Sequence, residues 1–317
     1  MTPAGVEPCL GLWAETTGGH ATLVNHSENH TFRVDAAAGR FFLRVHRPGY
    51  QSAAAIASEL AWLTALRAET GLPVPRPLAG RDGEIIQRLS TAGAPPRHAV
   101  LFAAEPGREP TPADDLSGLF ETLGRYAATA HRHAEKFRPP AGFVRPRWDA
   151  TILDANELWG DWRKAPHVDG SVAAILTRLD GALRADLAAY GTAPGRFGLI
   201  HADMRLANLL VDADRVTLID FDDCGFGWFM YDFAAAISFY EDDPRAAHWR
   251  TRWLAGYRTV RPLDPVDLAI LDAMVLLRRM ALLAWIGSHH ETPLAQAHAD
   301  AFAAGTAALA ETYLDRR

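Results

Sequence analysis

Lysine is almost absent from this chain. Only Lys136 and Lys164 occur among its 317 residues, so nearly all of the positive charge is carried by arginine. Neither lysine follows a glycine, whereas a P-loop of the Walker type ends in Gly-Lys-Ser/Thr. The sequence therefore excludes a Walker-type nucleotide site. Outside these two positions, a group that handles phosphate must be an arginine, a histidine or a backbone N–H.

Cysteine, net positive charge and long apolar runs are lacking as well. Cys9 and Cys224 are too few for a disulfide framework or a site of four thiolates. The formal net charge is −6, whereas a nucleic-acid binder is usually basic. Charged residues interrupt every apolar run well short of a membrane span, and residues 1–15 hold no apolar run typical of a secretory signal. We therefore expect a cytoplasmic protein that binds neither nucleic acid nor membrane.

The first third of the chain has a pattern typical of strands. Thr22–Asn25 is a short apolar run, and two further runs, Thr31–Asp35 and Arg40–His46, predict a hairpin. Residues Ala53–Ala68 carry apolar side chains at helical spacing. Two more strands are predicted by the runs Glu84–Leu89 and Ala99–Phe102.

The rest of the chain is mainly helical in pattern, and residues 244–260, 264–290 and 293–315 predict three helices. One group of short strands, Phe197–Ile200, Leu209–Val211 and Val216–Phe221, interrupts it. Strands followed by helices predict an α+β fold in two lobes. The connector rich in Ala, Pro, Gly and Glu after the first strands predicts lobes of residues 1–104 and 105–317.

The segment Leu199–Asp223 holds four polar residues at the ends of apolar strands. They are His201, Asp203, Asn208 and Asp220. Kinases place an Asp that accepts the proton of the substrate hydroxyl, then an Asn that binds metal and, after a hairpin, an Asp that also binds metal. The residue types fit because Mg²⁺ prefers oxygen ligands and a carboxylate can orient a hydroxyl and accept its proton.

The motif HxDxxxxN followed by IDFD resembles the aminoglycoside-phosphotransferase and choline-kinase group, which has a protein-kinase-like fold. By this resemblance Asp203 is the catalytic base, Asn208 and Asp220 bind the metal, and Asp232 is a buried carboxylate that holds the loop. The chain departs from the family at Ala202, where glycine is commoner. The resemblance implies direct transfer of the γ-phosphate of ATP, or of GTP, to a hydroxyl with Mg²⁺ as cofactor.

Arg205 lies two residues after the predicted base, where Ser/Thr kinases have a cation that contacts the γ-phosphate. We expect the same contact here. Asp222 and Asp223 follow the metal-binding Asp220, and either is a candidate contact for the substrate. The segment around Arg278 is another candidate wall of the substrate pocket.

A kinase needs a cation on a strand for the α- and β-phosphates and a helical carboxylate that orients it. Arg44 alternates with Leu43 and Val45 along a strand, and Glu59 is the only acid between Arg40 and Ala68. The pair Arg44–Glu59 is therefore our candidate. Further predicted nucleotide contacts are Ser27 and Asn29 in a turn and the connector backbone at Ala104.

The predicted substrate is the hydroxyl of a small molecule: an aminoglycoside-like antibiotic, an amino acid, an amino alcohol or a sugar. The segment LRVHRPGY resembles the homoserine-kinase-like and stress-response-kinase members of the group, so a protein Ser/Thr kinase is a second hypothesis. Only eleven residues separate Asp220 from Asp232, too few for a long activation segment, which favours the small molecule. A nucleotide-binding scaffold without activity is a third hypothesis. The oligomeric state is not readable from the sequence.

Overall fold

The structure is a computed structural model that describes residues 1–26, 29–90 and 95–317. The chain divides into two compact units. Unit 1 comprises Met1–Arg108, Phe137–Arg145 and Leu210–Asp222, and unit 2 comprises Glu109–Lys136, Pro146–Leu209 and Asp223–Arg317. The predicted division at residues 104 and 105 stays a prediction.

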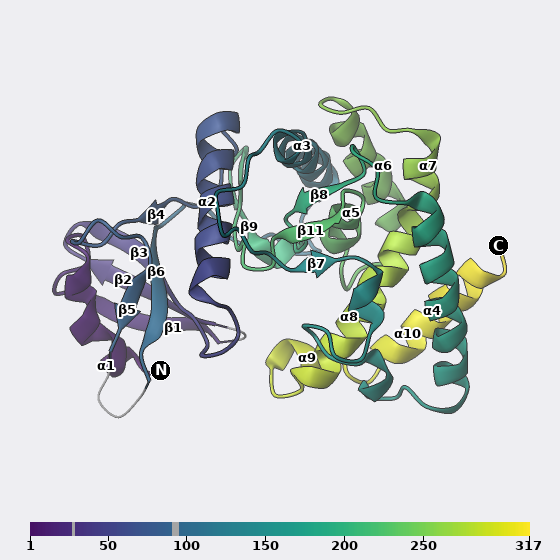
Figure 1. The fold of residues 1–317 in the computed structure, drawn as a ribbon, viewed down its shortest axis with the longest axis horizontal. Coiled ribbons are helices and arrows are strands. Elements are labelled where there is room, and N and C mark those ends of the chain that lie inside the picture. Colours follow the sequence, from purple (N-terminus) through teal and green to yellow (C-terminus); the bar gives the residue numbers. More distant parts are fainter. Residues whose placement is uncertain (27–28, 91–94) are drawn as a thin grey trace. The chain divides into compact units, whose positions relative to one another are not determined.

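Unit 1 is built on an antiparallel sheet with strand order β1-β2-β3-β6-β4, in which β5 also pairs with β6 (Figure 1). Its strands are β1 (His20–His26), β2 (His30–Ala36), β3 (Gly39–Val45), β4 (Pro77–Leu78), β5 (Gln87–Leu89) and β6 (Arg97–Ala103). The predicted hairpin is β2–β3, whose register pairs Thr31 with Arg44. The short helix α1 (Pro3–Val6) and the 3-10 turn η1 (Glu7–Leu12) precede the sheet, and neither was predicted.

The two faces of strand β3 have different partners. Leu43 and Val45 are buried in an apolar core with Val6, Leu10 and Trp13 from the N-terminal segment. Arg44, between them, meets helix α2 (Ala53–Thr70) instead. Side chains alternate across a strand, and this alternation aims the arginine away from the apolar core, as predicted.

Unit 1 also contains the hairpin of β9 (Leu209–Asp212) and β10 (Arg215–Leu218), apart from Leu209, which is assigned to unit 2. Arg108 pairs with Val211 of β9 through backbone hydrogen bonds. The prediction that the second strand continues to Phe221 was wrong, because β10 ends at Leu218. The chain turns there: Asp220 has a φ of 62°, which no strand residue adopts.

Unit 2 is mainly helical, as predicted. Its helices are α3 (Ser117–Ala134), α4 (Gly170–Tyr190), α5 (Tyr231–Ala236), α6 (Ala246–Arg258), α7 (Pro265–Ala269), α8 (Leu271–Ser288), α9 (Pro293–His298) and α10 (Phe302–Leu314), with 3-10 turns η2 (Ala150–Leu153), η3 (Trp162–Lys164) and η4 (Leu206–Asn208). Two predicted helices were wrong in extent. Residues 264–290 form α7 and α8, and residues 293–315 form α9 and α10, because the chain turns at Ile270 and again at Ala299–Ala301 without any proline or glycine to signal it.

A three-stranded sheet of order β7-β11-β8 lies within unit 2. It consists of β7 (Arg147–Trp148), β8 (Phe197–Ile200) and β11 (Gly225–Trp228), and only β8 was predicted. Strand β11 escaped prediction because its sequence, GFGW, is rich in glycine. The glycines are required by packing: a Cβ at Gly225 would lie 2.4 Å from the Pro146 carbonyl oxygen, and one at Gly227 would lie 2.5 Å from Ile200 Cδ1.

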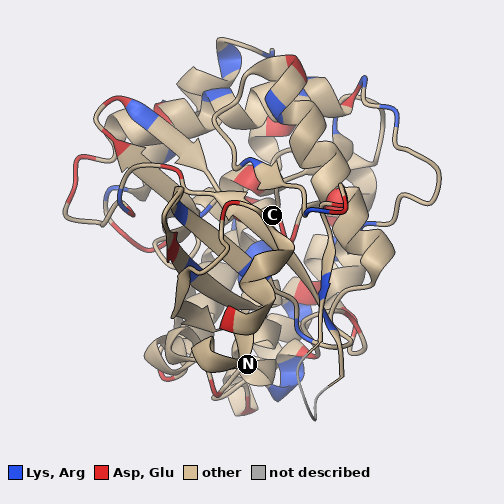
Figure 2. Cartoon of the chain, turned by 90° about the vertical axis from the view of Figure 1, so that its left-hand side faces the viewer, with Lys and Arg blue, Asp and Glu red and all other residues tan. Residues whose placement is uncertain are grey.

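Acidic and basic residues are interspersed along the helices, strands and loops that the cartoon colours (Figure 2). Among the described residues, no helix combines the length and the apolar character that crossing a membrane requires.

Candidate active site

The loop that carries Asp203 follows strand β8 and is held by a buried carboxylate. Asp232, fully buried at the start of α5, accepts hydrogen bonds from the backbone N–H of Ala202 at 2.7 Å and of His201 at 3.2 Å. Its Oδ2 also lies 2.9 Å from Nε2 of His131. The predicted role of Asp232 in holding the loop is therefore confirmed. Ala202 has a φ of 67°, which explains why glycine is favoured at this position.

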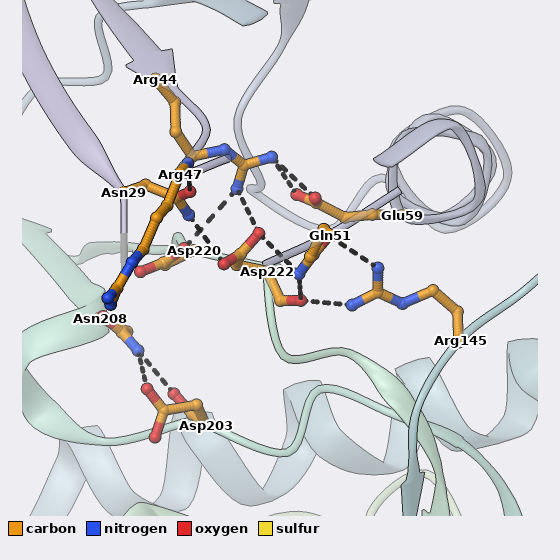
Figure 3. Close-up of polar contacts among 10 residues, drawn as sticks. All are labelled: Asn29, Arg44, Arg47, Gln51, Glu59, Arg145, Asp203, Asn208, Asp220 and Asp222. Carbon is orange, nitrogen blue, oxygen red and sulfur yellow. Dashed lines mark hydrogen bonds and ion pairs between the residues drawn. The ribbon is translucent and has the colours of Figure 1, made fainter. Parts of the chain in front are cut away.

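Both carboxylate oxygens of Asp203 accept hydrogen bonds within unit 2. Oδ2 accepts from Asn208 Nδ2 at 2.6 Å (Figure 3) and from Arg205 Nε at 3.0 Å, while Oδ1 accepts from Arg278 Nη2. Burial alone would raise the pKa of Asp203, but the charges of Arg205 and Arg278 hold the pKa below its ordinary value. The carboxylate is thus ionised and oriented, as a group that accepts a proton from a hydroxyl must be.

Arg205 is placed beside the predicted base. Its side chain is 26% exposed, and its Nε is occupied by the bond to Asp203. The predicted contact of Arg205 with the γ-phosphate stays a prediction.

In unit 1 the structure forms the ion pair between Arg44 and Glu59. Nη2 of Arg44 donates to both carboxylate oxygens of Glu59, at 2.8 and 2.7 Å, and both side chains are buried (Figure 3). Nη1 of the same guanidinium lies 3.7 Å from Asp220 Oδ1 and 3.7 Å from Asp222 Oδ1. Burial would lower the pKa of Arg44, but the surrounding carboxylates, Glu59 first, raise it above its ordinary value. Arg44 is therefore a permanent cation, and Glu59 of helix α2 fixes its position.

Asp222 is buried and bound on both of its carboxylate oxygens. Oδ2 accepts from Asn29 Nδ2 at 2.8 Å, and Oδ1 accepts from Gln51 Nε2 at 3.0 Å (Figure 3). Burial raises the pKa of this carboxyl to about 6. Asn29 also accepts from the backbone N–H of Arg47 at 3.2 Å, so its amide links the segment that follows strand β3 to the loop of Asp222.

The other predicted residues have different settings. The side chain of Asp220 is 47% exposed in unit 1. Asp223 is partly buried in unit 2, where its backbone carbonyl accepts from Trp148 Nε1 at 2.7 Å. The backbone N–H of Ala104 donates to the Arg40 carbonyl at 3.3 Å. Ser27 lies outside the described residues.

Asn208 in unit 2 and Asp220 in unit 1 each have oxygen atoms of the kind that a divalent metal binds. The amide nitrogen of Asn208 donates to both the backbone oxygen and the carboxylate of Asp203, at 2.9 and 2.6 Å. This leaves its carbonyl oxygen as the atom that can act as a ligand. The partly exposed carboxylate of Asp220 offers two more oxygens, and oxygen is the donor that Mg²⁺ prefers.

The sequence did not predict several of the contacts that hold Asp203 and Asp222. Gln51 and Arg145 both donate to the backbone carbonyl oxygen of Asp222, and Arg145 donates to the Ala55 carbonyl at 3.0 Å as well. Arg278, considered only as a pocket wall, binds Asp203. Arg145 and Arg278 lie 77 and 75 residues from the partners they bind, so no local spacing signals these contacts.

Comparisons with known proteins agree with this geometry. Residues 20–269 match the family model described as the phosphotransferase enzyme family. A solved structure of a microcompartment-associated aminopropanol kinase is 43% identical, with a TM-score of 0.90 over 98% of this chain and 97% of the other. A homoserine kinase of Pseudomonas aeruginosa is 32% identical over 246 residues, which cover 76% of this chain and 72% of the relative.

The solved structure of the amicoumacin kinase hAmiN, in complex with AMP-PNP and Ca²⁺, has a TM-score of 0.78 at 20% identity, over 95% of this chain and 92% of the other. At this identity the likeness concerns the fold, which is the protein-kinase-like fold expected from the sequence. Since the family model covers residues 20–269, the chain belongs to the phosphotransferase enzyme family and is a kinase.

Proposed function

We propose that this enzyme transfers the γ-phosphate of ATP to the hydroxyl group of a small amino alcohol, with Mg²⁺ as cofactor. The likeness to the aminopropanol kinase carries the proposal, because 43% identity extends over 98% of the chain. Among the acceptors that the sequence left open, it favours an amino alcohol over an antibiotic, an amino acid or a sugar. Residues 1–104 are proposed as the nucleotide-binding lobe and residues 105–317 as the catalytic and substrate-binding lobe.

Asp203 is proposed as the catalytic base. An ionised carboxylate held by three donors keeps a fixed orientation, so it can accept a hydrogen bond from the substrate hydroxyl and align its oxygen with the γ-phosphorus. As the new O–P bond forms and the bond from phosphorus to the bridging oxygen of ADP breaks, the proton passes to this carboxylate. Arg205 is proposed to stabilise the charge on the transferred group.

Arg44 is proposed as the cation for the α- and β-phosphates, with Glu59 as its anchor. Asn29 and Ser27 are proposed to contact the phosphates, and the backbone near Ala104 to contact the adenine. Asn208 and Asp220 are proposed as metal ligands, and a bound divalent metal would neutralise negative charge on the phosphates.

The proposed contact for the substrate's ammonium group is Asp223 rather than Asp222. Asp222 has both oxygens engaged within unit 1, so it is better suited to holding its loop. Asp223 lies in the same unit as a cluster of aromatic rings. Trp148 is 4.8 Å from Trp159 and 6.1 Å from Tyr231 between ring centroids, and Trp148 donates to the backbone of Asp223. A carboxylate with aromatic faces is a setting that attracts an organic cation.

The test is the rate of nucleotide consumption by the purified protein with Mg²⁺. The panel contains amino alcohols, amino acids such as homoserine, aminoglycosides, sugars and a generic protein substrate, each with ATP and with GTP. Asp203→Ala is the matched control, with an expected loss of about 10²–10⁴-fold in kcat. We expect turnover with one or more amino alcohols, preferably with ATP.

Each other outcome has a distinct meaning. Turnover only with a protein substrate would establish a protein kinase and overturn the proposal. Turnover only with another small molecule would correct the acceptor. Nucleotide binding without turnover on any member of the panel would favour the scaffold hypothesis. Asp223→Asn should raise the KM of an amino alcohol more than that of the same alcohol without its amine, and equal effects would remove Asp223 from the ammonium site.

A further inference from the structure

Helix α8 buries two consecutive arginines. Arg278 is 1% exposed and Arg279 is 3% exposed. A guanidinium removed from water to this extent requires hydrogen-bonding partners of its own, since an unpaired buried charge is strongly unfavourable. The two arginines satisfy this requirement in different places, and only one of them contacts the proposed catalytic loop.

Arg278 donates to three groups within unit 2. Its Nη2 bonds to Asp203 Oδ1, its Nη1 to the Ala202 carbonyl at 3.1 Å, and its Nε to Ser238 Oγ at 3.1 Å. Its guanidinium carbon also lies 5.0 Å from the ring centroid of Trp159. Because the guanidinium is planar and all three of its nitrogens are bonded, Arg278 is held in one orientation. It can therefore fix the orientation of the groups that it binds.

The contacts of Arg278 complete the hold on Asp203. Asn208 and Arg205 both bond to Oδ2, so these two bonds hold the carboxylate plane through one oxygen only. The bond from Arg278 to Oδ1 fixes that plane. The bond to the carbonyl of Ala202, the residue with positive φ, fixes the backbone that precedes the base.

We propose that Arg278 is a positioning residue for phosphoryl transfer, which holds the carboxylate of Asp203 and its preceding peptide in the orientation that receives the substrate hydroxyl. It acts through Asp203 and need not touch substrate or nucleotide. The inference rests on the proposed role of Asp203, and a displacement of about 1 Å in such a group can cost about 100-fold in rate.

Arg279 provides a matched control on the same helix. Its Nη1 bonds to Glu241 at 2.7 Å, its Nε to Thr306 at 3.0 Å and its Nη2 to the Phe302 carbonyl at 3.3 Å. It is as buried as Arg278 and as fully bonded, yet none of these partners belongs to the catalytic loop. Substitution at this position reports the effect of losing a buried arginine from α8 without disturbing Asp203.

The experiment measures kcat, both KM values and thermal stability for Arg278→Met and Arg279→Met. We expect Arg278→Met to lower kcat by about 100-fold with both KM values within about threefold of the parent. Arg279→Met should lower the Tm, because Glu241 loses its partner, while kcat of the folded enzyme stays within about fivefold. Equal losses of kcat in the two variants would mean that Arg278 acts through general packing, and would overturn the proposal.

A double-mutant cycle separates positioning from packing more strictly. If Arg278 acts through Asp203, Arg278→Met should cause no further loss of activity in an Asp203→Asn background, where the oriented carboxylate is already gone. A further loss of about 100-fold in that background would show that Arg278 has a separate role. If Arg278→Met does not fold, Arg278→Lys serves in its place, with an expected loss of about tenfold because the charge remains and the planar fork does not.

The failure of this proposal can be told apart from failure of the proposed function. If the parent enzyme phosphorylates none of the panel, the acceptor is wrong, and the same cycle is measured on its slow hydrolysis of ATP, in which Asp203 would orient water. Hydrolysis reduced equally by Asp203→Asn, by Arg278→Met and by both together would still support positioning. Hydrolysis unaffected by Arg278→Met would overturn it.

Discussion

In each unit a buried arginine is bound to a carboxylate of the proposed machinery, but the two arginines have opposite roles. In unit 1 the proposed working group is the cation Arg44, and Glu59 anchors it. In unit 2 the proposed working group is the carboxylate Asp203, and Arg278 anchors it. Both anchors are 1% exposed, whereas Arg44 is 7% and Asp203 is 8% exposed. In both pairs the anchor is the more deeply buried partner.

The strongest test of this comparison removes the working group of unit 1. Arg44→Met should lower the free energy of unfolding by about 3–5 kcal/mol, because the carboxylate of Glu59 stays buried without its partner. The double variant Arg44→Met, Glu59→Leu should recover most of this stability, since a buried ion pair can be replaced by apolar side chains at little cost. Urea unfolding measures both changes.

Nucleotide affinity, measured by calorimetry, separates stability from function in the same variants. Because Arg44 is the proposed phosphate cation, the double variant should bind ATP weakly even though it is stable. Affinity equal to that of the parent in the double variant would show that the Arg44–Glu59 pair is structural only, and the parallel with unit 2 would fail.

The two ion pairs also differ in how far the sequence could predict them. Arg44 and Glu59 are 15 residues apart, on a strand and the next helix, and strand alternation shows which way the arginine points. Arg278 and Asp203 are 75 residues apart, so their contact depends on how α8 packs in unit 2. Local pattern thus predicts partners on neighbouring elements and is silent on partners that tertiary packing brings together.

The same limit applies to the fold. The hairpin β2–β3 was predicted because its apolar alternation is local, whereas β11 was missed because the glycines that permit its close packing are poor strand formers. The proposed catalytic loop, which carries Asp203, was predicted for a different reason: its residue types stand at the spacing that kinases use, and chemistry rather than packing sets that spacing. The hydrogen bond between Asp222 and Asn29 could not be predicted in either way, because the two residues are 193 positions apart in the sequence.

A buried histidine in each unit extends the comparison to pH. His131 in unit 2 has both ring nitrogens hydrogen-bonded, to Asp232 at 2.9 Å and to Tyr257 at 3.0 Å. Neither ring nitrogen of His46 in unit 1 has a partner among the described residues. Burial, followed by the charges of Arg44, His98 and Arg145, lowers the pKa of His46 to about 2.

The sign of the effect follows from proton uptake. Above pH 6.5, the ordinary pKa of histidine, His46 is neutral in both states and does not affect stability. As the pH falls below 6.5 the unfolded chain binds a proton that the folded protein does not, so folding loses about 1.4 kcal/mol per pH unit for this residue. We expect His46→Phe to be about 2 kcal/mol more stable than the parent at pH 5, relative to their difference at pH 7.5. Unfolding by urea at both pH values measures this, and an unchanged difference would exclude His46 as a source of acid sensitivity.

The smallest expected change in stability concerns two alanines with positive φ, one in each unit. Ala202, in the loop that carries Asp203, has a φ of 67° and is fully buried, whereas Ala213, in the β9–β10 turn, has a φ of 48° and is exposed. Glycine relieves the left-handed strain of about 1–2 kcal/mol at either position but adds about 0.5–1 kcal/mol of backbone entropy to the unfolded chain. Ala213→Gly should therefore stabilise the protein by about 0.5–1 kcal/mol, as measured by the midpoint of unfolding.

At Ala202 a third term enters, because the buried methyl group contributes about 0.8 kcal/mol that glycine loses. Ala202→Gly should leave stability nearly unchanged, although glycine is commoner there in the family that the chain resembles. A larger gain at Ala202 than at Ala213 would mean that the strain at Ala202 exceeds that of an ordinary left-handed residue. The two hydrogen bonds of Ala202, from its N–H to Asp232 and from Arg278 to its carbonyl, would then be holding the loop in a strained conformation.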